Sequence, residues 1–251
     1  MAERVAIILA AGISSRMNTQ LPKVLHKVCG QPILSYTLDA CRAAGIKKIY
    51  VVVGYGAEKV KAEFDGADDI VWVNQDEQKG TAHAVLCCKQ YLQDFEGETL
   101  VLCGDGPLIR AEVLEKLIGE HSPETAVTLA TAILDDPTGY GRILRDSDGG
   151  IRGIVEHNDC TSEQLAIKEV NPSYYLFNNK VLFDVAGRVK ADNAKKEYYL
   201  TDAVSIIIAD GMQVSAVIAV RPEEAMSVNT LEQLRMVNEI MCQRLQARGK
   251  E

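Results

Sequence analysis

The chain has 251 residues, 47% of them hydrophobic and 25% charged, which is the composition of a globular protein with a sizeable core. Its formal net charge of −8 argues against a nucleic-acid groove, because such a surface needs clustered lysine and arginine. The first apolar run is far too short to span a membrane, and no charged-then-apolar leader precedes it. We therefore expect a cytoplasmic protein that binds neither nucleic acid nor membrane.

Seven cysteines are scattered along the chain without any Cys-x-x-Cys pair. An odd number of cysteines with no regular spacing favours reduced thiols in the core over a disulfide framework or a zinc site. They are Cys29, Cys41, Cys87, Cys88, Cys103, Cys160 and Cys242.

Strands and helices alternate through the first half of the chain, and this alternation predicts a parallel sheet between two layers of helices. The loops after the strands then share one edge of the sheet, where such folds bind ligands. The predicted strands cover residues 5–9, 48–53, 70–73 and 99–103, and the predicted helices cover residues 32–44, 57–64 and 80–91.

The alternation loosens in the second half, where an antiparallel hairpin is expected around the turn Asp146-Ser-Asp-Gly-Gly150. Pro172 falls inside a predicted strand and indicates a bulge or an edge position there. We find no repeat and no linker, so residues 1–251 are expected to form one domain. Its later elements are strands at 125–134, 141–145, 151–155, 169–177 and 214–220, and helices at 200–209 and 230–248.

The first strand ends in small residues, at 10–12, that leave the backbone open to a bound group. Gly12 can also adopt a positive φ that other residues resist. Hydroxyls at 14–15 follow, and then the cations Arg16 and Lys23. Amides, hydroxyls and two cations together favour a polyphosphate site over the alternative, an ordinary turn with solvated charges.

A second polar segment, Gln75-Asp-Glu-Gln-Lys-Gly-Thr-Ala-His83, links the third strand to a helix. Gln75 has the donor and acceptor needed to read the edge of a nucleobase, and its alternative role is ordinary surface polarity. Gly80 and Thr81 begin the helix, where amides attract anions and where helix capping is equally compatible.

Asp105 lies between two glycines at the end of the fourth strand, which suits a ligand of Mg²⁺ as well as an Asx turn. In the second half, the predicted hairpin brings Gly141 near Glu156, whose carboxylate could accept hydrogen bonds from sugar hydroxyls or remain solvated. Asn171 and Asn229 are the remaining candidates, although Asn229 precedes the last helix and is foremost a good N-cap.

These residues form a pattern that resembles sugar-1-phosphate nucleotidyltransferases. The similarity is greatest to the uridylyltransferase half of bacterial bifunctional N-acetylglucosamine-1-phosphate uridylyltransferase/acetyltransferases, and it spans nearly the whole chain in the family's order. The opening motif is shared by many nucleotidyltransferases, and the later motifs are more specific. The matching segments are Leu9-Ala-Ala-Gly-Ile-Ser-Ser-Arg-Met17, Pro22-Lys-Val-Leu-His26, residues 75–83, Gly104-Asp-Gly-Pro-Leu108, Gly139-Tyr-Gly-Arg-Ile143, Gly153-Ile-Val-Glu-His157, Glu197-Tyr-Tyr-Leu-Thr-Asp202 and Val228-Asn229.

The resemblance implies a Rossmann-like nucleotide-diphospho-sugar transferase fold that converts UTP and N-acetylglucosamine 1-phosphate into UDP-N-acetylglucosamine and pyrophosphate. Residues 1–110 would form the nucleotide-binding half, 111–228 the sugar-phosphate-binding half, and 229–251 a C-terminal helix. By the family's motifs, Arg16 would neutralise the β and γ phosphates and Lys23 the reacting phosphates. Uridine would be held by Leu9, Ala10, Ala11, Gly12, Gln75, Gly80 and Thr81; Mg²⁺ by Asp105 and Asn229; and the sugar phosphate by Gly141, Glu156 and Asn171.

The chain departs from the family pattern at three places. Ser14-Ser15 replaces Gly-Thr, Ala82 replaces a glycine, and Asn171-Pro-Ser173 replaces Asn-Thr-Gly, which bears on the sugar that is accepted. The sequence contains no hexapeptide repeats, so we expect uridylyl transfer without acetylation. Two alternatives stay open: transfer to a different sugar or alditol phosphate, and a nucleotide-sugar-binding module without catalysis.

Overall fold

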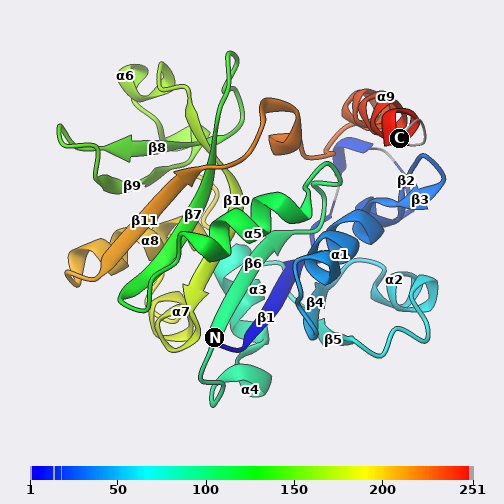
Figure 1. Cartoon of the computed structure of the whole chain (residues 1–251), viewed down its shortest axis with the longest axis horizontal. Helices are drawn as coiled ribbons and strands as arrows, with labels where there is room; N and C mark the ends of the chain where they lie inside the picture. Colours follow the sequence, from blue (N-terminus) through cyan, green and yellow to red (C-terminus); the bar gives the residue numbers. More distant parts are fainter. Residues whose placement is uncertain (1, 14, 18, 249–251) are drawn as a thin grey trace.

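A mixed sheet forms the centre of this computed structural model, which describes residues 2–13, 15–17 and 19–248. Its main strand order is β11-β7-β10-β6-β1-β4-β5, and the hairpin β8–β9 is attached through β8 to β10 (Figure 1). The strands of this sheet are β1 (Arg4–Leu9), β4 (Ile49–Val53), β5 (Ile70–Asn74), β6 (Glu98–Cys103), β7 (Thr125–Ile133), β8 (Gly141–Arg145), β9 (Ile151–Val155), β10 (Glu169–Asn178) and β11 (Gln213–Ile218).

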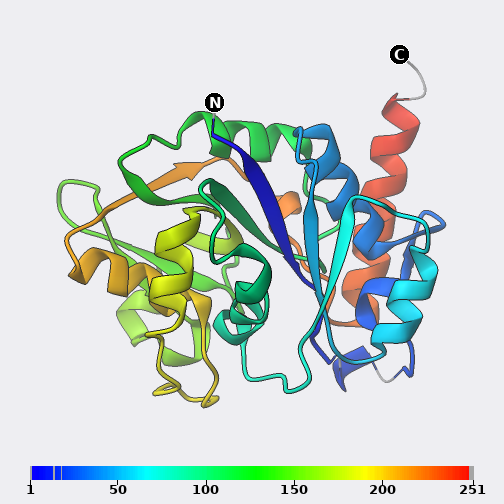
Figure 2. The same cartoon turned by 90° about the horizontal axis from the view of Figure 1, so that it is seen from below.

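Helices cover both faces of the sheet, as the view along its edge makes clear (Figure 2). One face packs against α1 (Ile33–Ala43), α2 (Ala57–Glu63) and α5 (Ala111–Gly119). The other face packs against α3 (Thr81–Cys87), α4 (Lys89–Leu92), α7 (Asn179–Ala186) and α8 (Leu200–Ala209). The three-layer arrangement predicted from the alternation of strands and helices is therefore confirmed.

The parallel strands form because their apolar residues are buried on both faces. Ile7 and Ile8 of β1 are fully buried, and they point to opposite layers of helices. Strand β1 pairs in parallel with β4 on one side and β6 on the other, and Leu9 lies opposite Val52 and Cys103. This register brings the loops after β1 and β6 to one edge of the sheet.

Strand β10 runs antiparallel between β6 and β7, and it carries the bulge that Pro172 predicts. The register with β7 shifts between Val170 and Tyr174. Ser173 in this bulge has a φ of 66°, a left-handed conformation that favours glycine. Before the bulge, Asn171 pairs with Gly141 of β8, so the hairpin is attached where β10 is distorted.

Several elements differ from the sequence prediction. The helix expected over residues 80–91 is two helices, α3 and α4, which meet at Cys88. The prediction missed helices α5 and α7, the short helix α6 (Ser162–Leu165) and the small hairpin β2 (Lys27–Val28) and β3 (Gln31–Pro32). Short 3₁₀ turns also occur at Ser15–Met17, Lys23–Leu25, His157–Asp159 and Pro222–Ala225.

The last helix, α9 (Leu231–Arg248), packs on the chain's own β2–β3 hairpin. Val237 and Met241 are buried in a small core with Val28, and Arg244 donates to the Leu108 carbonyl at 2.7 Å. A disulfide joins Cys29 to Cys242, with 6.1 Å between their Cα atoms, so the prediction that all cysteines are reduced was wrong. The pairing was hidden because 213 residues separate the two cysteines.

None of the helices in the described part of the chain combines the length and the apolar character needed to cross a membrane.

Candidate active site

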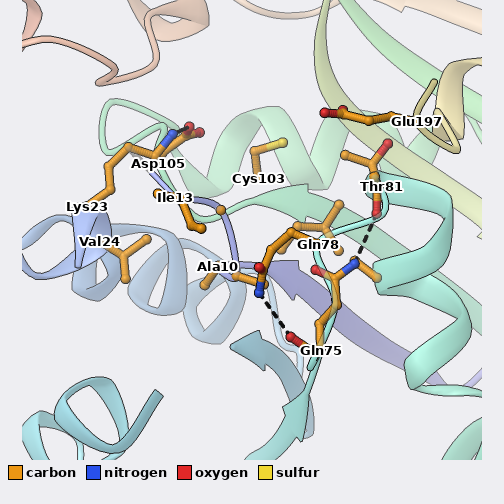
Figure 3. Close-up of a pocket in the computed structure, with 15 residues that line it drawn as sticks. Ala10, Ile13, Lys23, Val24, Gln75, Gln78, Thr81, Cys103, Asp105 and Glu197 are labelled. Carbon is orange, nitrogen blue, oxygen red and sulfur yellow. Dashed lines mark hydrogen bonds and ion pairs between the residues drawn. The ribbon is translucent and has the colours of Figure 1, made fainter. Parts of the chain in front are cut away.

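The first of two adjoining cavities opens at the carboxyl ends of β1 and β5 and has a volume of about 360 Å³. Its wall contains every residue that the sequence assigns to uridine, together with both Lys23 and Asp105 (Figure 3). The lining residues are Leu9, Ala10, Ala11, Gly12, Ile13, Lys23, Val24, Gln75, Gln78, Gly80, Thr81, Ala84, Cys103, Asp105 and Glu197.

A second cavity, of about 240 Å³, lies on the other side of Asp105, between the β8–β9 hairpin and the start of α9. It brings together the three residues predicted to bind the sugar phosphate, Gly141, Glu156 and Asn171. Arg16 and Asn229 also line it, whereas Asp105 and Cys103 line both cavities. Residues from the two halves of the chain thus share one cleft.

Lys23, Asp105 and Asn229 converge where the cavities meet. The Lys23 ammonium forms an ion pair with the Asp105 carboxylate and donates to Asn229 Oδ1 at 3.1 Å. One carboxylate and one amide oxygen thus face a single positive charge. Oxygen donors of this kind suit a hard divalent cation, and two protein ligands leave room for phosphate oxygens and water. The described residues contain no cluster of three or more histidine, cysteine or acidic side chains suited to a metal.

Asn229 does not cap the last helix, contrary to the N-cap role that the sequence favoured. Thr230 takes that role, because its hydroxyl accepts from the Gln233 amide at 3.1 Å. Gln233 reaches back to the amide of Asn229 at 2.8 Å. The Asn229 side chain instead accepts from Lys23 and donates to Ser227 Oγ at 2.9 Å. Capping by Thr230 lets Asn229 face the cleft.

The Asp105 side chain also does not form the Asx turn that was its alternative role. The carboxylate pairs with Lys23, while the backbone carbonyl of Asp105 accepts from the Val228 amide at 2.9 Å. This second bond fixes the loop after β6 to the segment that carries Asn229. The two candidate metal ligands are therefore held side by side by the backbone.

Gln75 is 3% exposed, so it is not an ordinary surface residue. Its Nε2 group donates to the Gly80 carbonyl at 3.2 Å and lies 3.0 Å from His83 Nδ1. No described residue donates to its side-chain oxygen. The amide oxygen of Gln75 is thus available as an acceptor in a cavity that the residue lines.

Gly80 and Thr81 serve first to dock another segment of the chain. Gly80 has a φ of 111°, and a Cβ there would come within 2.5 Å of the Tyr198 carbonyl oxygen. The Tyr198 carbonyl accepts from the Ala82 amide at 2.9 Å, and Thr81 Oγ1 accepts from the Leu200 amide at 2.8 Å. The Ala82 amide at the start of α3 is therefore already bonded within the chain, while the anion role expected at Gly80 and Thr81 stays a prediction. Docking Tyr198 brings neighbouring Glu197 to the cavity rim.

The loop after β1 offers an open backbone, although for a reason other than the one predicted. Gly12 does not have a positive φ, and a Cβ placed on it would meet no atom within 4 Å. The Ala10 amide is already bonded to the Val52 carbonyl at 2.8 Å. Gly12 thus contributes space for a ligand instead of an unusual backbone conformation.

Glu156 is half-buried beneath the hairpin, where Thr201 Oγ1 donates to its Oε1 atom at 3.0 Å. Burial raises the pKa of Glu156, and the Thr201 hydrogen bond and the Lys195 charge partly offset this effect. A Cβ on Gly141 would lie 3.7 Å from both carboxylate oxygens of Glu156. The carboxylate is a positioned acceptor rather than a solvated acid.

Asn171 is buried and held by its own strand. Its Oδ1 atom accepts from the Ser173 amide at 3.0 Å, and its Nδ2 group donates to the Tyr175 hydroxyl at 2.6 Å. One hydrogen of Nδ2 has no acceptor among the described residues and can bind a ligand.

Arg16 and Lys23 lie on opposite sides of Asp105. Arg16 is exposed and lines the second cavity, and Lys23 lines the first. Of the neighbouring serines, Ser14 lies outside the described residues, and only the backbone of Ser15 is described, so the prediction of hydroxyl ligands at 14–15 rests on the sequence.

Sequence reasoning missed several residues that line the cleft. Gln78 donates to the Gln75 carbonyl at 3.1 Å, and Gly54 makes room for its side chain. Cys103 faces both cavities, and burial raises its pKa to about 12, so the thiol stays protonated. Tyr175 and Thr201 hold the sugar-side residues. The alternation of β10 could have placed Tyr175 and Phe177 on one face, but it could not show what they contact.

Comparison with known proteins identifies the family of this chain. Residues 6–159 match the family model described as a MobA-like NTP transferase domain. The chain is 45% identical over 246 residues to the bifunctional protein GlmU of Geobacillus sp. (strain WCH70), and 47% identical over 241 residues to that of Pelotomaculum thermopropionicum. These matches cover 98% and 96% of this chain but only 53% and 52% of the relatives, so the chain spans about half their length.

A solved structure shares the fold at much lower sequence identity. UDP-glucose pyrophosphorylase complexed with UDP-glucose superposes with a TM-score of 0.80 and 16% identity, over 97% of this chain and 100% of that one. With the family model matching more than half of the described chain, fold and sequence agree. The chain belongs to the family of MobA-like NTP transferase domains and is a nucleotidyltransferase.

Proposed function

We propose that the protein transfers UMP from UTP to N-acetylglucosamine 1-phosphate, giving UDP-N-acetylglucosamine and pyrophosphate in a Mg²⁺-dependent reaction. The observation that carries this proposal is the position of Asp105, which lines both cavities at the point where they join. Two substrates in adjoining cavities would meet at this carboxylate. The motifs that match the uridylyltransferase family point to the same pair of substrates.

The first cavity is proposed to hold the nucleotide. Its volume of about 360 Å³ and its small-residue wall suit a nucleoside with its phosphates. Gln75 would accept from the imide N–H of uracil, since its oxygen receives no hydrogen bond from the described residues. The remaining contacts would come from Leu9, Ala10, Ala11, Gly12, Gly80 and Thr81.

The second cavity is proposed to hold the sugar phosphate. Glu156 would accept from sugar hydroxyls, and Asn171 would donate the second hydrogen of its Nδ2 group. Gly141 lines the same cavity, where a Cβ would crowd Ile154 Cγ2 at 3.1 Å and lie 3.7 Å from both carboxylate oxygens of Glu156. This assignment agrees with the division into a nucleotide half at residues 1–110, a sugar-phosphate half at 111–228 and a terminal helix at 229–251, which we retain as a proposal.

Asp105 and Asn229 would hold Mg²⁺, since their oxygens already face the same positive charge. When bound, the ion would polarise the α-phosphoryl group and link the two reactants. Lys23 would then turn from Asp105 toward the phosphates, where an ammonium acts as a compact point charge.

The reaction needs no general base. The phosphate oxygen of the sugar phosphate is already ionised at neutral pH, and it attacks the α-phosphorus of UTP in line. A new P–O bond forms, and the bond between the α-phosphorus and the bridging oxygen breaks. Pyrophosphate leaves with that electron pair. Positioning by the two cavities and neutralisation by Arg16 and Lys23 would supply most of the rate enhancement.

A matrix of nucleotides and sugar phosphates tests this proposal. Purified protein with Mg²⁺ should turn over UTP with N-acetylglucosamine 1-phosphate faster than any other pair of a nucleoside triphosphate and a sugar or alditol phosphate. Faster turnover of another pair would replace the assigned substrates. Binding without turnover of any pair would favour a nucleotide-sugar-binding module.

A further inference from the structure

A buried ion cluster joins the two segments that carry Asp105 and Asn229. Glu224 is fully buried, its carboxylate is paired with Arg110, and it lies 3.6 Å from a guanidinium nitrogen of Arg244. Arg110 ends the loop that contains Asp105, and Glu224 belongs to the 3₁₀ turn that precedes Asn229. Arg110, Glu224 and Arg244, which we call the Glu224 cluster, line neither cavity of the cleft.

Glu224 is held by its side chain and by its backbone. One carboxylate oxygen accepts from Arg110, and the other accepts from the backbone amide of Arg221 at 3.0 Å. The Glu224 carbonyl accepts from the Tyr174 hydroxyl of β10 at 3.2 Å. Directional hydrogen bonds thus fix this turn both to the loop after β6 and to β10.

Arg244 extends these contacts to α9, the helix that follows Asn229. One guanidinium nitrogen donates to the Leu108 carbonyl in the loop after β6 at 2.7 Å, and the other lies 3.5 Å from Glu223. Burial lowers the pKa of Arg244, and the charge of Glu224 opposes this effect. A single side chain of α9 therefore contacts both segments that carry the candidate metal ligands.

Stability alone is a poor reason for such a cluster. Burying charges is costly, and apolar side chains of similar volume often stabilise a fold as well or better. Charged groups differ from apolar ones because their hydrogen bonds hold the partners at defined distances and angles. A Mg²⁺ ion requires this accuracy, since it favours nearly octahedral sites with ligands at about 2.0–2.1 Å. The cluster thus suits a site whose ligands come from segments far apart in the chain.

We propose that the residues of the Glu224 cluster are positioning residues, which hold Asp105 and Asn229 at the spacing that a divalent cation requires. They act from outside the cavities, through the backbone of the loop after β6 and of the turn before α9. The bond from the Val228 amide to the Asp105 carbonyl, at 2.9 Å, joins the same two segments next to the site. This inference rests on the part of the proposed function that assigns Mg²⁺ to Asp105 and Asn229, and not on the identity of the sugar.

Replacing the whole cluster by apolar side chains separates positioning from stability. The triple variant Arg110→Met, Glu224→Leu, Arg244→Met should unfold at the same urea concentration as wild type or at a higher one. Its affinity for Mn²⁺ alone, measured by electron paramagnetic resonance of the free ion, should fall about tenfold. The variant loses two positive charges and one negative charge, so electrostatics alone would strengthen the binding of a cation. Weaker binding therefore reports the position of the ligands.

Kinetics provide a second readout of the same variant. The Mg²⁺ concentration that gives half the maximal rate should rise about tenfold, while kcat at saturating Mg²⁺ should change less than about twofold. Arg244→Leu alone should also weaken the binding of Mn²⁺. Arg244→Lys keeps the charge and one donor, so it should recover part of that loss.

The matched control replaces an ion pair that lies away from the cleft. Arg4 and Glu98 pair at 2.6 Å at the amino ends of β1 and β6, and their side chains are 23% and 15% exposed. The double variant Arg4→Met, Glu98→Leu should leave both the affinity for Mn²⁺ and the activity unchanged. An equal loss of Mn²⁺ affinity in this control would show that the Glu224 cluster has no special role.

Wild-type affinity for Mn²⁺ in a folded triple variant would overturn the proposal. If the triple variant does not fold, unchanged binding of Mn²⁺ by Arg244→Leu would overturn it instead. Asp105→Ala should abolish the same binding, and a variant that still binds Mn²⁺ like wild type would place the ion elsewhere and reject the positioning role. A wild-type protein that binds Mn²⁺ through Asp105 and the cluster, but releases no pyrophosphate with any substrate pair, would reject the proposed function and leave the positioning role supported.

Discussion

Lys23 and Asp105 form an ion pair at the junction of two cavities, although 82 residues separate them in the chain. The side chains of the two residues are 14% and 17% exposed, so the pair is largely shielded from solvent. A carboxylate in this position can exchange a lysine for another cation at little structural cost. The pair therefore marks where a metal ion and the reacting phosphates would meet.

Replacing Asp105 by alanine should lower kcat by at least about 100-fold, because it removes the carboxylate proposed to hold Mg²⁺ beside the reacting phosphates. The free energy of unfolding should fall by no more than about 3 kcal/mol, since the variant leaves one partly buried lysine without its partner. Steady-state kinetics and urea unfolding measure the two effects. Wild-type turnover in the variant would remove Asp105 from the reaction.

Gly12→Ala should weaken the binding of UTP without destabilising the fold. The φ of Gly12 lies outside the left-handed region and a Cβ meets no protein atom within 4 Å, so unfolding in urea should show unchanged or slightly higher stability, by up to about 1 kcal/mol. Gly12 lines the cavity proposed for the nucleotide, so we expect the added methyl group to raise KM for UTP about tenfold. A large loss of stability would show that the backbone at Gly12 requires glycine.

Glu156 should give sugar binding a characteristic pH dependence. Burial raises its folded-state pKa above the ordinary value of 4.5, so KM for the sugar phosphate should begin to rise at a higher pH than for an exposed carboxylate as the solution is acidified. Protein stability should change in the opposite direction. Between the ordinary pKa and the raised folded-state pKa, Glu156 keeps its proton in the folded state and loses it in the unfolded state. Its contribution to the free energy of unfolding therefore decreases as pH rises through that range.

The Glu156→Gln variant isolates these effects. Above the raised pKa of Glu156 it should unfold at a higher urea concentration than wild type, and at pH 4 the difference should disappear. Sugar-phosphate binding should weaken about tenfold at neutral pH, because a neutral amide is a poorer acceptor than a carboxylate. Equal stability of both proteins at pH 8 would contradict a buried, charged Glu156.

Ser173→Gly should stabilise the protein by about 1 kcal/mol, because serine is strained at a φ of 66° and glycine is not. The Ser173 amide remains, so its hydrogen bond to Asn171 is kept. Chemical unfolding at neutral pH measures the change. A less stable variant would show that the serine hydroxyl contributes more than the backbone strain costs.

The disulfide between Cys29 and Cys242 should make stability sensitive to reductant. It closes a loop of more than 200 residues, and its reduction should lower the free energy of unfolding by about 2–4 kcal/mol. Cys242→Ser should show the lower stability with or without dithiothreitol. Cys87→Ser, which removes a free thiol, should remain as sensitive to reductant as wild type.

Much of the fold was predictable because its signals are local. Apolar runs such as residues 5–9 specify buried strands, and the hairpin at 141–155 follows from two short strands around a turn rich in glycine and aspartate. Helices α5 and α7 have only nine and eight residues, and short apolar runs such as Val181-Leu-Phe183 do not distinguish a helix from a strand. No proline or glycine lies at Cys88, so the sequence gives no signal that α3 and α4 are separate helices.

The site was less predictable because its contacts are long-range. The residue types of Asp105 and Asn229 indicate metal ligands, but only the folded chain brings both to Lys23. Asn229 and Thr230 are both residue types that cap helices, and only the structure shows that the Thr230 hydroxyl accepts from the Gln233 amide. The docking of Tyr198 on Gly80 and the pairing of Cys29 with Cys242 likewise depend on segments far apart in the chain.

Pyrophosphate release is the measurement that decides whether the protein catalyses the proposed uridylyl transfer. Purified protein is mixed with UTP and N-acetylglucosamine 1-phosphate, with and without Mg²⁺, and both products are quantified. We expect one pyrophosphate for each UDP-N-acetylglucosamine formed, with turnover abolished by a chelator and by Asp105→Ala. Release of pyrophosphate without the nucleotide sugar, or no release from folded protein with Mg²⁺ present, would contradict it.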